Sequence, residues 1–257
     1  MLVNGHQLHV ESYGPASGPA VILLHHGLGS VYAWEEQVPA LISAGYYVVA
    51  YERWGYGRSD ARPALSMPYF EEDLDDLRAI LDQCAIQDAA LVGHSDGGTI
   101  ALYFAARHPE RLNSLVSIAA HVYIEAKMYT DIESIRQAYC ENIRFRRGLE
   151  RVHAERTDGL FYGWYNGWNR QENKTWDMRS ELKHITCRSL VVQGLDDEHA
   201  SPQHARDIAA GIPGAELWLV PGAAHVLPQD KPELFNERLL EFLQRAGKSK
   251  SSSNAVY

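Results

Sequence analysis

The 257 residues are 46% hydrophobic, which is enough for one substantial core with a small insertion. The formal net charge is −9 and the acidic residues are spread along the chain, so the broad positive field that nucleic acid binding requires is missing. The N-terminal residues lack the charged and then apolar run of a secretory signal, and no apolar stretch approaches the roughly 20 residues that cross a bilayer. We therefore expect a cytoplasmic protein that binds neither nucleic acid nor membrane, and the oligomeric state stays open.

The first half of the chain predicts alternating strands and helices. Asn4-Gly5 between two short apolar stretches is typical of a two-residue hairpin turn. A helical pattern follows Pro68 and another covers residues 100–106, and a last helix is expected from about residue 232 to 243. Apolar runs between the helical patterns predict buried strands at residues 20–25, 46–51, 89–92, 112–119, 190–193 and 217–220. The alternation predicts an α/β fold with a mainly parallel sheet.

Residues 121–186 interrupt this alternation, because they show helical periodicity and no convincing strand. Thr130 and Glu133 have the spacing of a capping box, which predicts a helix that begins at Thr130. We expect residues 121–186 to form a helical lid inserted into a core domain of residues 1–120 and 187–246. The Ser-rich residues 247–257 are expected to be a disordered tail.

The three cysteines do not form a metal or disulfide pattern. Cys84, Cys140 and Cys187 lie far apart and no Cys-x-x-Cys pair occurs. We expect three reduced thiols in or near the core, and no metal site.

The sharpest motif is Gly93-His94-Ser95-Asp96-Gly97, which stands between a predicted strand and a predicted helix. This is the context of a nucleophile elbow, a turn so tight that the residues two before and two after the serine must lack a Cβ. The turn would present the Ser95 hydroxyl at the carboxyl edge of the sheet. It would also place the Asp96 N–H at a helix N-terminus, where it can stabilise an oxyanion. Ser95 is the predicted nucleophile.

A serine hydroxyl needs a base within hydrogen-bond reach, and the base needs a carboxylate to fix its tautomer. His225 follows a predicted strand in a Pro-Gly-Ala-Ala-His turn, so it should lie at the same sheet edge as Ser95. The preceding strand ends in Gly194-Leu-Asp-Asp-Glu, and either Asp196 or Asp197 can be the acid. A second oxyanion donor is expected in the glycine-rich loop after the first parallel strand, and Leu28 N–H is the candidate.

With these motifs in this order, residues 1–246 resemble the α/β-hydrolase family. Besides the elbow, the resemblance rests on His26-Gly27, Glu52-Arg-Trp-Gly-Tyr-Gly-Arg-Ser59, Gly194-x-x-Asp197 and His225. It implies an eight-stranded, mostly parallel sheet whose second strand is antiparallel. It also places the acid on Asp197 and the second oxyanion donor on Leu28. Glu52 stands where the family has aspartate, a difference we expect to be structural.

A looser resemblance, to valacyclovir-hydrolase-like enzymes, rests on Ser95-Asp-Gly-Gly98 and Ala119-Ala-His-Val-Tyr123. It implies esters of small acyl or aminoacyl groups and an acidic residue that reads a positive substrate group. Glu125 is a candidate for that residue, although a solvated lid charge is the alternative that we favour.

Three further residues are candidates for substrate binding. His121 directly follows a predicted strand, so it lines the pocket or serves as a hinge at the base of the lid. Phe161, Trp164, Tyr165 and Trp168 fall at helical spacing, and most must pack in the interior. Trp164 and Trp168 are the two that we expect to cap an acyl pocket.

The predicted activity is hydrolysis of a small-molecule carboxylic ester through an acyl-enzyme, with no metal or organic cofactor. Ser95 argues against epoxide hydrolase and haloalkane dehalogenase activity, since those relatives carry an aspartate at the elbow. Carbon–carbon bond hydrolysis, lactonase and amidase activities with the same triad stay open. A ligand-sensing receptor with slow turnover is the alternative from another class.

Overall fold

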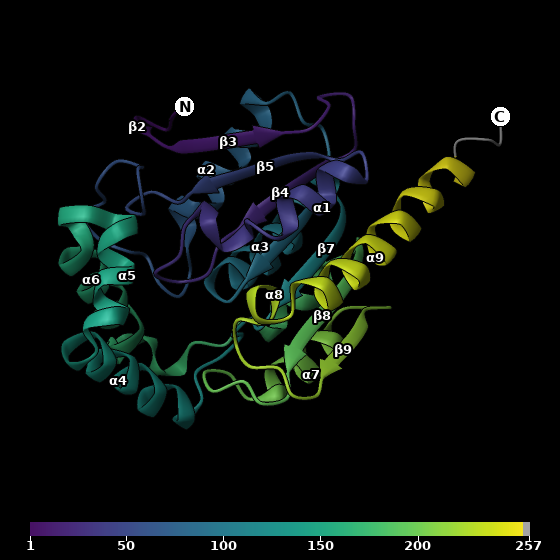
Figure 1. The fold of residues 1–257 in the computed structure, drawn as a ribbon. Coiled ribbons are helices and arrows are strands. Elements are labelled where there is room, and N and C mark those ends of the chain that lie inside the picture. The colour runs from purple at the N-terminus through teal and green to yellow at the C-terminus, as the bar shows by residue number, and fades with distance from the viewer. Residues whose placement is uncertain (254–257) are drawn as a thin grey trace.

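The computed structural model describes the backbone of residues 1–253 and the side chains of residues 1–246. Its centre is a seven-stranded sheet in the order β3-β5-β4-β6-β7-β8-β9 (Figure 1). The strands of this sheet are β3 (His9–Tyr13), β4 (Ala20–Leu24), β5 (Tyr47–Glu52), β6 (Ala89–His94), β7 (Leu112–Ile118), β8 (Arg188–Gly194) and β9 (Glu216–Val220). All neighbours pair in parallel except β3, which lies at one edge and runs antiparallel to β5. The predicted mostly parallel α/β sheet is confirmed.

The expected number of eight strands is wrong for this sheet. The chain before β3 forms a separate two-stranded sheet of β1 (Leu2–Val3) and β2 (His6–Gln7). Asn4 and Gly5 turn between them with φ of 47° and 92°, which is the positive-φ pair that a type I′ hairpin requires. Because the hairpin pairs β1 with β2, these residues do not extend the sheet beyond β3.

Two hydrophobic clusters lie on opposite faces of the sheet, because neighbouring side chains on a strand point to opposite sides. In β4, Val21 and Leu23 belong to one cluster and Ile22 and Leu24 to the other. Helices α2 (Glu71–Gln83), α3 (Asp96–Arg107) and α7 (Pro202–Gly211) cover the face of Ile22. Helices α1 (Gln37–Ser43) and α9 (Pro232–Ser253), with the short α8 (Leu227–Asp230), cover the other face.

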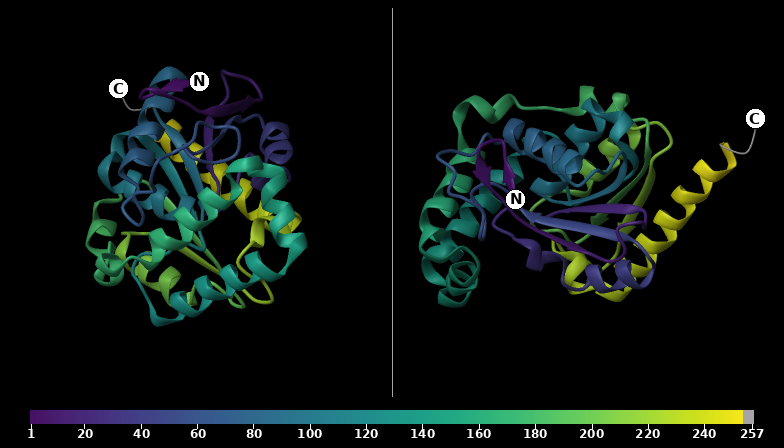
Figure 2. Two further views of the ribbon diagram at one scale, coloured as in Figure 1. Left: turned by 90° about the vertical axis from the view of Figure 1, so that its left-hand side faces the viewer. Right: turned by 90° about the horizontal axis from the view of Figure 1, so that it is seen from above.

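Three helices come between β7 and β8, where the sequence predicted a helical insertion. They are α4 (Ala126–Glu141), α5 (Ile143–His153) and α6 (Thr157–Asn169), and we call them the inserted helices. Figures 1 and 2 show them gathered at one end of the molecule, away from the C-terminal end of α9. Short 3₁₀ turns complete the chain at η1 (Val31–Trp34), η2 (Pro109–Arg111), η3 (Ala154–Arg156), η4 (Gln171–Thr175) and η5 (Arg179–His184).

Several local predictions differ from the structure. The capping box is wrong, because α4 begins at Ala126 and Thr130 lies inside the helix, where its carbonyl accepts a hydrogen bond from Ser134 Oγ. Helix α9 continues to Ser253, past the predicted start of the tail, since each added residue of an existing helix gains a backbone hydrogen bond. Residues 254–257 of that tail lie outside the described residues. The three thiols are free, but Cys140 is exposed on α4 rather than near the core.

No helix within the described residues is both long and apolar enough to cross a membrane.

Candidate active site

The turn between β6 and α3 holds Ser95 in a backbone conformation that serine rarely adopts, with φ 55° and ψ −117°. A Cβ added to Gly93 would lie 2.1 Å from the carbonyl oxygen of Gly97. One added to Gly97 would lie 2.3 Å from the carbonyl oxygen of Leu24 on the neighbouring strand. Both positions therefore need glycine, and the turn has the form expected of a nucleophile elbow.

His225 and Asp197 are in direct contact although 28 positions separate them. The two carboxylate oxygens of Asp197 lie 2.9 and 3.0 Å from His225 Nδ1. Because a carboxylate accepts, Nδ1 carries the proton and Nε2 is left free to take one from a nucleophile. Ser95 and His225 line the same cavity, and in the described part of the chain no hydrogen bond joins their side chains. Asp196 is exposed, so the structure brings Asp197 rather than Asp196 to the imidazole.

The surroundings of Asp197 keep it ionised. Its carboxylate also accepts from Gln193 Nε2 at 2.5 Å and from the N–H groups of His199 and Ala200 at 2.8 and 2.9 Å. Burial alone would raise the pKa of Asp197, but the hydrogen bond and charge of His225, together with the two N–H groups, outweigh it. The pKa of this carboxyl therefore lies well below its ordinary value.

Two side chains fasten the backbone of the acid and the base. His94 Nε2 donates to the carbonyl of His225 at 2.8 Å. Lys127, on α4, donates to the carbonyls of Asp197 and Glu198 at 3.1 and 2.5 Å. One of the inserted helices is thereby attached to the loop that carries Asp197.

Leu28 and Asp96, the predicted oxyanion donors, both line the cavity beside Ser95. Asp96 is the first residue of α3, so its N–H has no partner within the helix. Across residues 1–253 neither its N–H nor that of Leu28 finds an acceptor. Unpaired N–H groups are rare inside proteins, and two beside one serine can receive a negatively charged oxygen.

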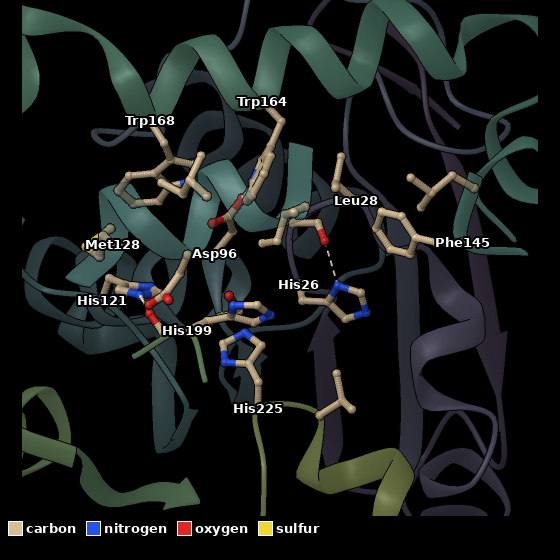
Figure 3. Close-up of a pocket in the computed structure, with 17 residues that line it drawn as sticks. His26, Leu28, Asp96, His121, Met128, Phe145, Trp164, Trp168, His199 and His225 are labelled. Carbon is tan, nitrogen blue, oxygen red and sulfur yellow. Dashed lines mark hydrogen bonds between the residues drawn. The ribbon is translucent and has the colours of Figure 1, made fainter. Parts of the chain in front are cut away.

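The cavity has a volume of about 200 Å³ and is largely apolar (Figure 3). His225 lies at its base, the inserted helices form the opposite wall, and Ser95 also lines the cavity. That wall consists of Met128, Asp131, Ile132, Ile135, Phe145, Leu149, Trp164 and Trp168.

His121 lines the cavity, which is the first of the two roles predicted for it. Its Nε2 donates to the carbonyl of His199 at 3.2 Å, and its own carbonyl accepts from Thr99 Oγ1 at 2.8 Å. Burial, with the nearby His204, lowers the pKa of His121, so the ring is neutral. The residue is thus held at both ends directly after β7, which also suits a fixed base for the insertion.

The four aromatic residues of α6 that the helical spacing singled out divide into two pairs. Trp164 and Trp168 reach the cavity, and Trp164 Nε1 donates to Asp96 Oδ2 at 3.2 Å. Phe161 is fully buried against Tyr139 of α4, with ring centroids 3.8 Å apart. Tyr165 donates its hydroxyl hydrogen to Glu133 on α4.

Sequence reasoning missed the side chain of Asp96. Its carboxylate lies in the cavity, 3.6 Å from the buried guanidinium of Arg53. Burial raises the pKa of Asp96, while Arg53 and the Trp164 indole act in the opposite direction. Asp131, a second carboxylate in the wall, pairs with Lys127 at 3.4 Å. No spacing signal links Asp96 to Arg53, because 43 positions and two secondary-structure elements, α2 and β6, separate them.

Glu125 does not line the cavity, so it does not take the predicted role of an acidic pocket residue. Its carboxylate is 20% exposed and accepts from the N–H and Oγ of Ser201 at 2.9 and 2.8 Å, so it is bound to the protein on one side and solvated on the other. It joins the start of α4 to the start of α7. Glu52 is buried under the loop that follows β5, where it accepts from Arg58 N at 2.5 Å, as a structural role requires.

Comparisons with known proteins agree on one family. The sequence profile of the alpha/beta hydrolase fold matches residues 19–180. The putative carbamate hydrolase RutD of Variovorax paradoxus is 30% identical, over 93% of this chain and 96% of that protein. The human serine hydrolase BPHL is also 30% identical, over 94% and 84%. The crystal structure of the enol-lactonase from Burkholderia xenovorans has a TM-score of 0.77 at 23% identity, over 95% and 99%, and this likeness shows the fold alone.

Proposed function

The chain belongs to the alpha/beta hydrolase family, and from that premise we propose that it is a serine hydrolase of small carboxylic esters. The strongest support is the set of groups gathered around one cavity. It contains Ser95 on its strained turn, His225 paired with Asp197, and two unpaired N–H groups. The 30% identity to the human serine hydrolase BPHL supports a serine nucleophile in this chain.

In the first half of the reaction, Ser95 Oγ attacks the ester carbonyl carbon while His225 Nε2 takes the hydroxyl proton. The carbonyl oxygen becomes an oxyanion, which the N–H groups of Leu28 and Asp96 stabilise. Asp197 stabilises the imidazolium and holds its tautomer. The tetrahedral intermediate then expels the alcohol, which receives the proton from His225, and Ser95 is left acylated.

In the second half, His225 takes a proton from water, and the resulting hydroxide attacks the acyl carbon. The same two N–H groups receive the second oxyanion. Collapse of this intermediate breaks the bond to Ser95 Oγ, which regains its proton from His225. The products are one carboxylic acid and one alcohol, and no step needs a metal or an organic cofactor.

The size and walls of the cavity favour a small acyl group. A volume of about 200 Å³ is below the roughly 300–1,000 Å³ that is usual for sites of larger ligands. Met128, Phe145 and Trp168 present apolar surface to whatever lies above Ser95. We assign the inserted helices the role of a lid over this acyl site.

Carbamate or amide hydrolysis is the second candidate, because the relative RutD carries the name of a putative carbamate hydrolase. The same triad can cleave a C–N bond, provided that His225 protonates the departing nitrogen. Matched ester, carbamate and amide substrates with one acyl group separate the candidates. A higher kcat/KM for the ester supports the proposal. A higher kcat/KM for the carbamate would make carbamate hydrolysis the first candidate and ester hydrolysis the second.

The test of the proposal is turnover of p-nitrophenyl esters from acetate to octanoate by the wild type and by Ser95→Ala. Loss of the hydroxyl should abolish turnover and leave circular dichroism unchanged. Ser117→Ala is the matched control, since Ser117 is buried in β7 with its Oγ unpaired among the described residues, and it should keep its rate. A folded Ser95→Ala variant that retains most of its rate contradicts the proposal, and a single burst in the wild type favours a receptor.

A further inference from the structure

Two histidine side chains hold the peptide groups on either side of Leu28. The carbonyl of Gly27 accepts from His26 Nδ1 at 2.6 Å (Figure 3), and the carbonyl of Leu28 accepts from His153 Nε2 at 2.9 Å. The second peptide is held at its other end too, since Gly29 N–H donates to the carbonyl of His26 at 3.1 Å. The backbone around Leu28 is therefore fixed by side chains.

This fixing decides where the Leu28 N–H points. In a trans peptide the N–H points opposite to the carbonyl of the same peptide, so His26 directs the Leu28 N–H away from itself. Leu28 also has φ of 60°, a left-handed conformation that is strained for a leucine. Without the contacts on its two sides, the residue would relax to negative φ and turn its N–H.

His153 reaches Leu28 from the inserted helices, 125 positions away in the sequence, as the last residue of α5. Its Nδ1 accepts from Gly57 N at 3.0 Å, so Nε2 must carry the proton that it donates to Leu28. The side chain is buried, with 1% of its surface exposed, and burial lowers its pKa. The imidazole is thus neutral, in one tautomer, and always able to donate to the loop.

We propose that His153 is a positioning residue that sets the oxyanion donor at Leu28, so that the insertion builds half of the oxyanion hole. The inference rests on the proposed function, in which the Leu28 N–H receives the oxyanion. His153 does not line the cavity and touches no reacting atom. Its effect passes through the Leu28 backbone alone.

Three variants test this role. His153→Leu removes both hydrogen bonds and keeps an apolar side chain in the buried space. His153→Gln keeps one N–H donor and one carbonyl acceptor in the same side chain and does not titrate. Arg156→Met is the matched control, because Arg156 attaches the same insertion to the carbonyls of Ser59 and Gly57 and does not contact Leu28.

The expected result for His153→Leu is a fall in kcat of about 10- to 100-fold with KM changed less than about threefold. The upper limit is set by complete loss of one oxyanion donor, which costs about 10²–10³ in kcat. His153→Gln should recover most of the rate, and Arg156→Met should stay within about threefold of wild type. If His153 acted only by holding the insertion in place, Arg156→Met would lower the rate as much as His153→Leu does. That result overturns the inference.

A second readout does not depend on ester turnover. An alkyl trifluoromethyl ketone adds to the serine as a hemiketal whose oxyanion occupies the same site, and ¹⁹F NMR measures its dissociation constant. The constant should rise for His153→Leu by the same factor by which kcat/KM falls, and an unchanged constant overturns the inference. A wild type that forms the hemiketal without cleaving esters removes the ester assignment alone, whereas a wild type that forms no hemiketal removes both.

Discussion

Replacing Asp197 with asparagine should disable the base while leaving the fold intact. All four groups that contact this carboxylate are donors: His225 Nδ1, Gln193 Nε2 and the N–H groups of His199 and Ala200. An asparagine side chain has one oxygen and one NH₂ group, so a donor must face a donor wherever the amide is placed. The outcome depends on which of the four can adapt.

The two backbone N–H groups cannot adapt, and both donate to Oδ1, so the asparagine oxygen must take that place. The NH₂ group then replaces Oδ2, where it faces Gln193 and His225. Gln193 can rotate, because its Oε1 has no partner among the described residues. His225 Nδ1 lies 2.9 Å from the position of the NH₂ group and 3.0 Å from the retained oxygen. Because the nearer NH₂ group needs an acceptor, we expect the proton to move from Nδ1 to Nε2, and in that tautomer His225 cannot take the proton of Ser95.

The expected loss in kcat is about 10⁴, the cost of the same change in a serine protease of another fold. Asp196→Asn is the control, since the Asp196 side chain is exposed and, among the described residues, only its N–H is bonded, to the carbonyl of Ala223 at 3.0 Å. It should lose less than about tenfold. Steady-state kinetics on one activated ester gives both values, and ¹⁵N chemical shifts of His225 report the tautomer. Equal losses, or an unchanged tautomer in Asp197→Asn, would refute this account.

Three further predictions concern the cavity and the buried imidazoles. Trp168→Leu should move the optimum of kcat/KM toward longer acyl chains, while Trp176→Leu, which alters the packing behind the wall, should lower the melting temperature without moving that optimum. His121→Ala should change selectivity among esters more than stability, and a lowered melting temperature with unchanged selectivity would assign it to support of the insertion alone. Burial lowers the pKa of His25, His26 and His94, that of His26 to about 4, so the unfolded chain binds more protons than the folded one below about pH 6.5. The free energy of unfolding should therefore fall steadily from pH 6.5 to pH 4. A melting temperature that stays constant over this range would contradict the conclusion that these three imidazoles are neutral in the folded protein.

The strands and the elbow could be predicted because their causes are local. Apolar runs of strand length locate β4 to β9, and two glycines flanking a serine between a strand and a helix specify the turn at Ser95. The register of Asp197 against His225 needed the family spacing, since neighbouring side chains on an extended segment point in opposite directions. Once the strand ends are known, the carboxyl edge of a parallel sheet brings these loops together.

The contacts that complete the site could not be predicted, because they join residues that no local pattern relates. His153 reads as one more histidine near the end of a basic amphipathic helix, and only the packing of α5 brings it to Leu28. The error at Thr130 has a similar origin. A capping box is a short motif, and α4 begins four residues before Thr130. The residue before the helix, Glu125, caps no N–H of α4 and is bonded to Ser201 at the start of α7.

The floor and the opposite wall of the cavity are built differently, and this limits which substitutions can change the specificity. The floor rests on two strand ends and the start of a helix. A Cβ added to Gly93, Gly97 or Gly194 there would lie within 2.3 Å of a backbone oxygen, so these positions accept only glycine. The opposite wall is made of side chains from helices, where Met128, Ile132, Phe145 and Leu149 can change size without moving any backbone of the floor. Natural drift and laboratory libraries should therefore find new substrates almost entirely through substitutions in α4, α5 and α6.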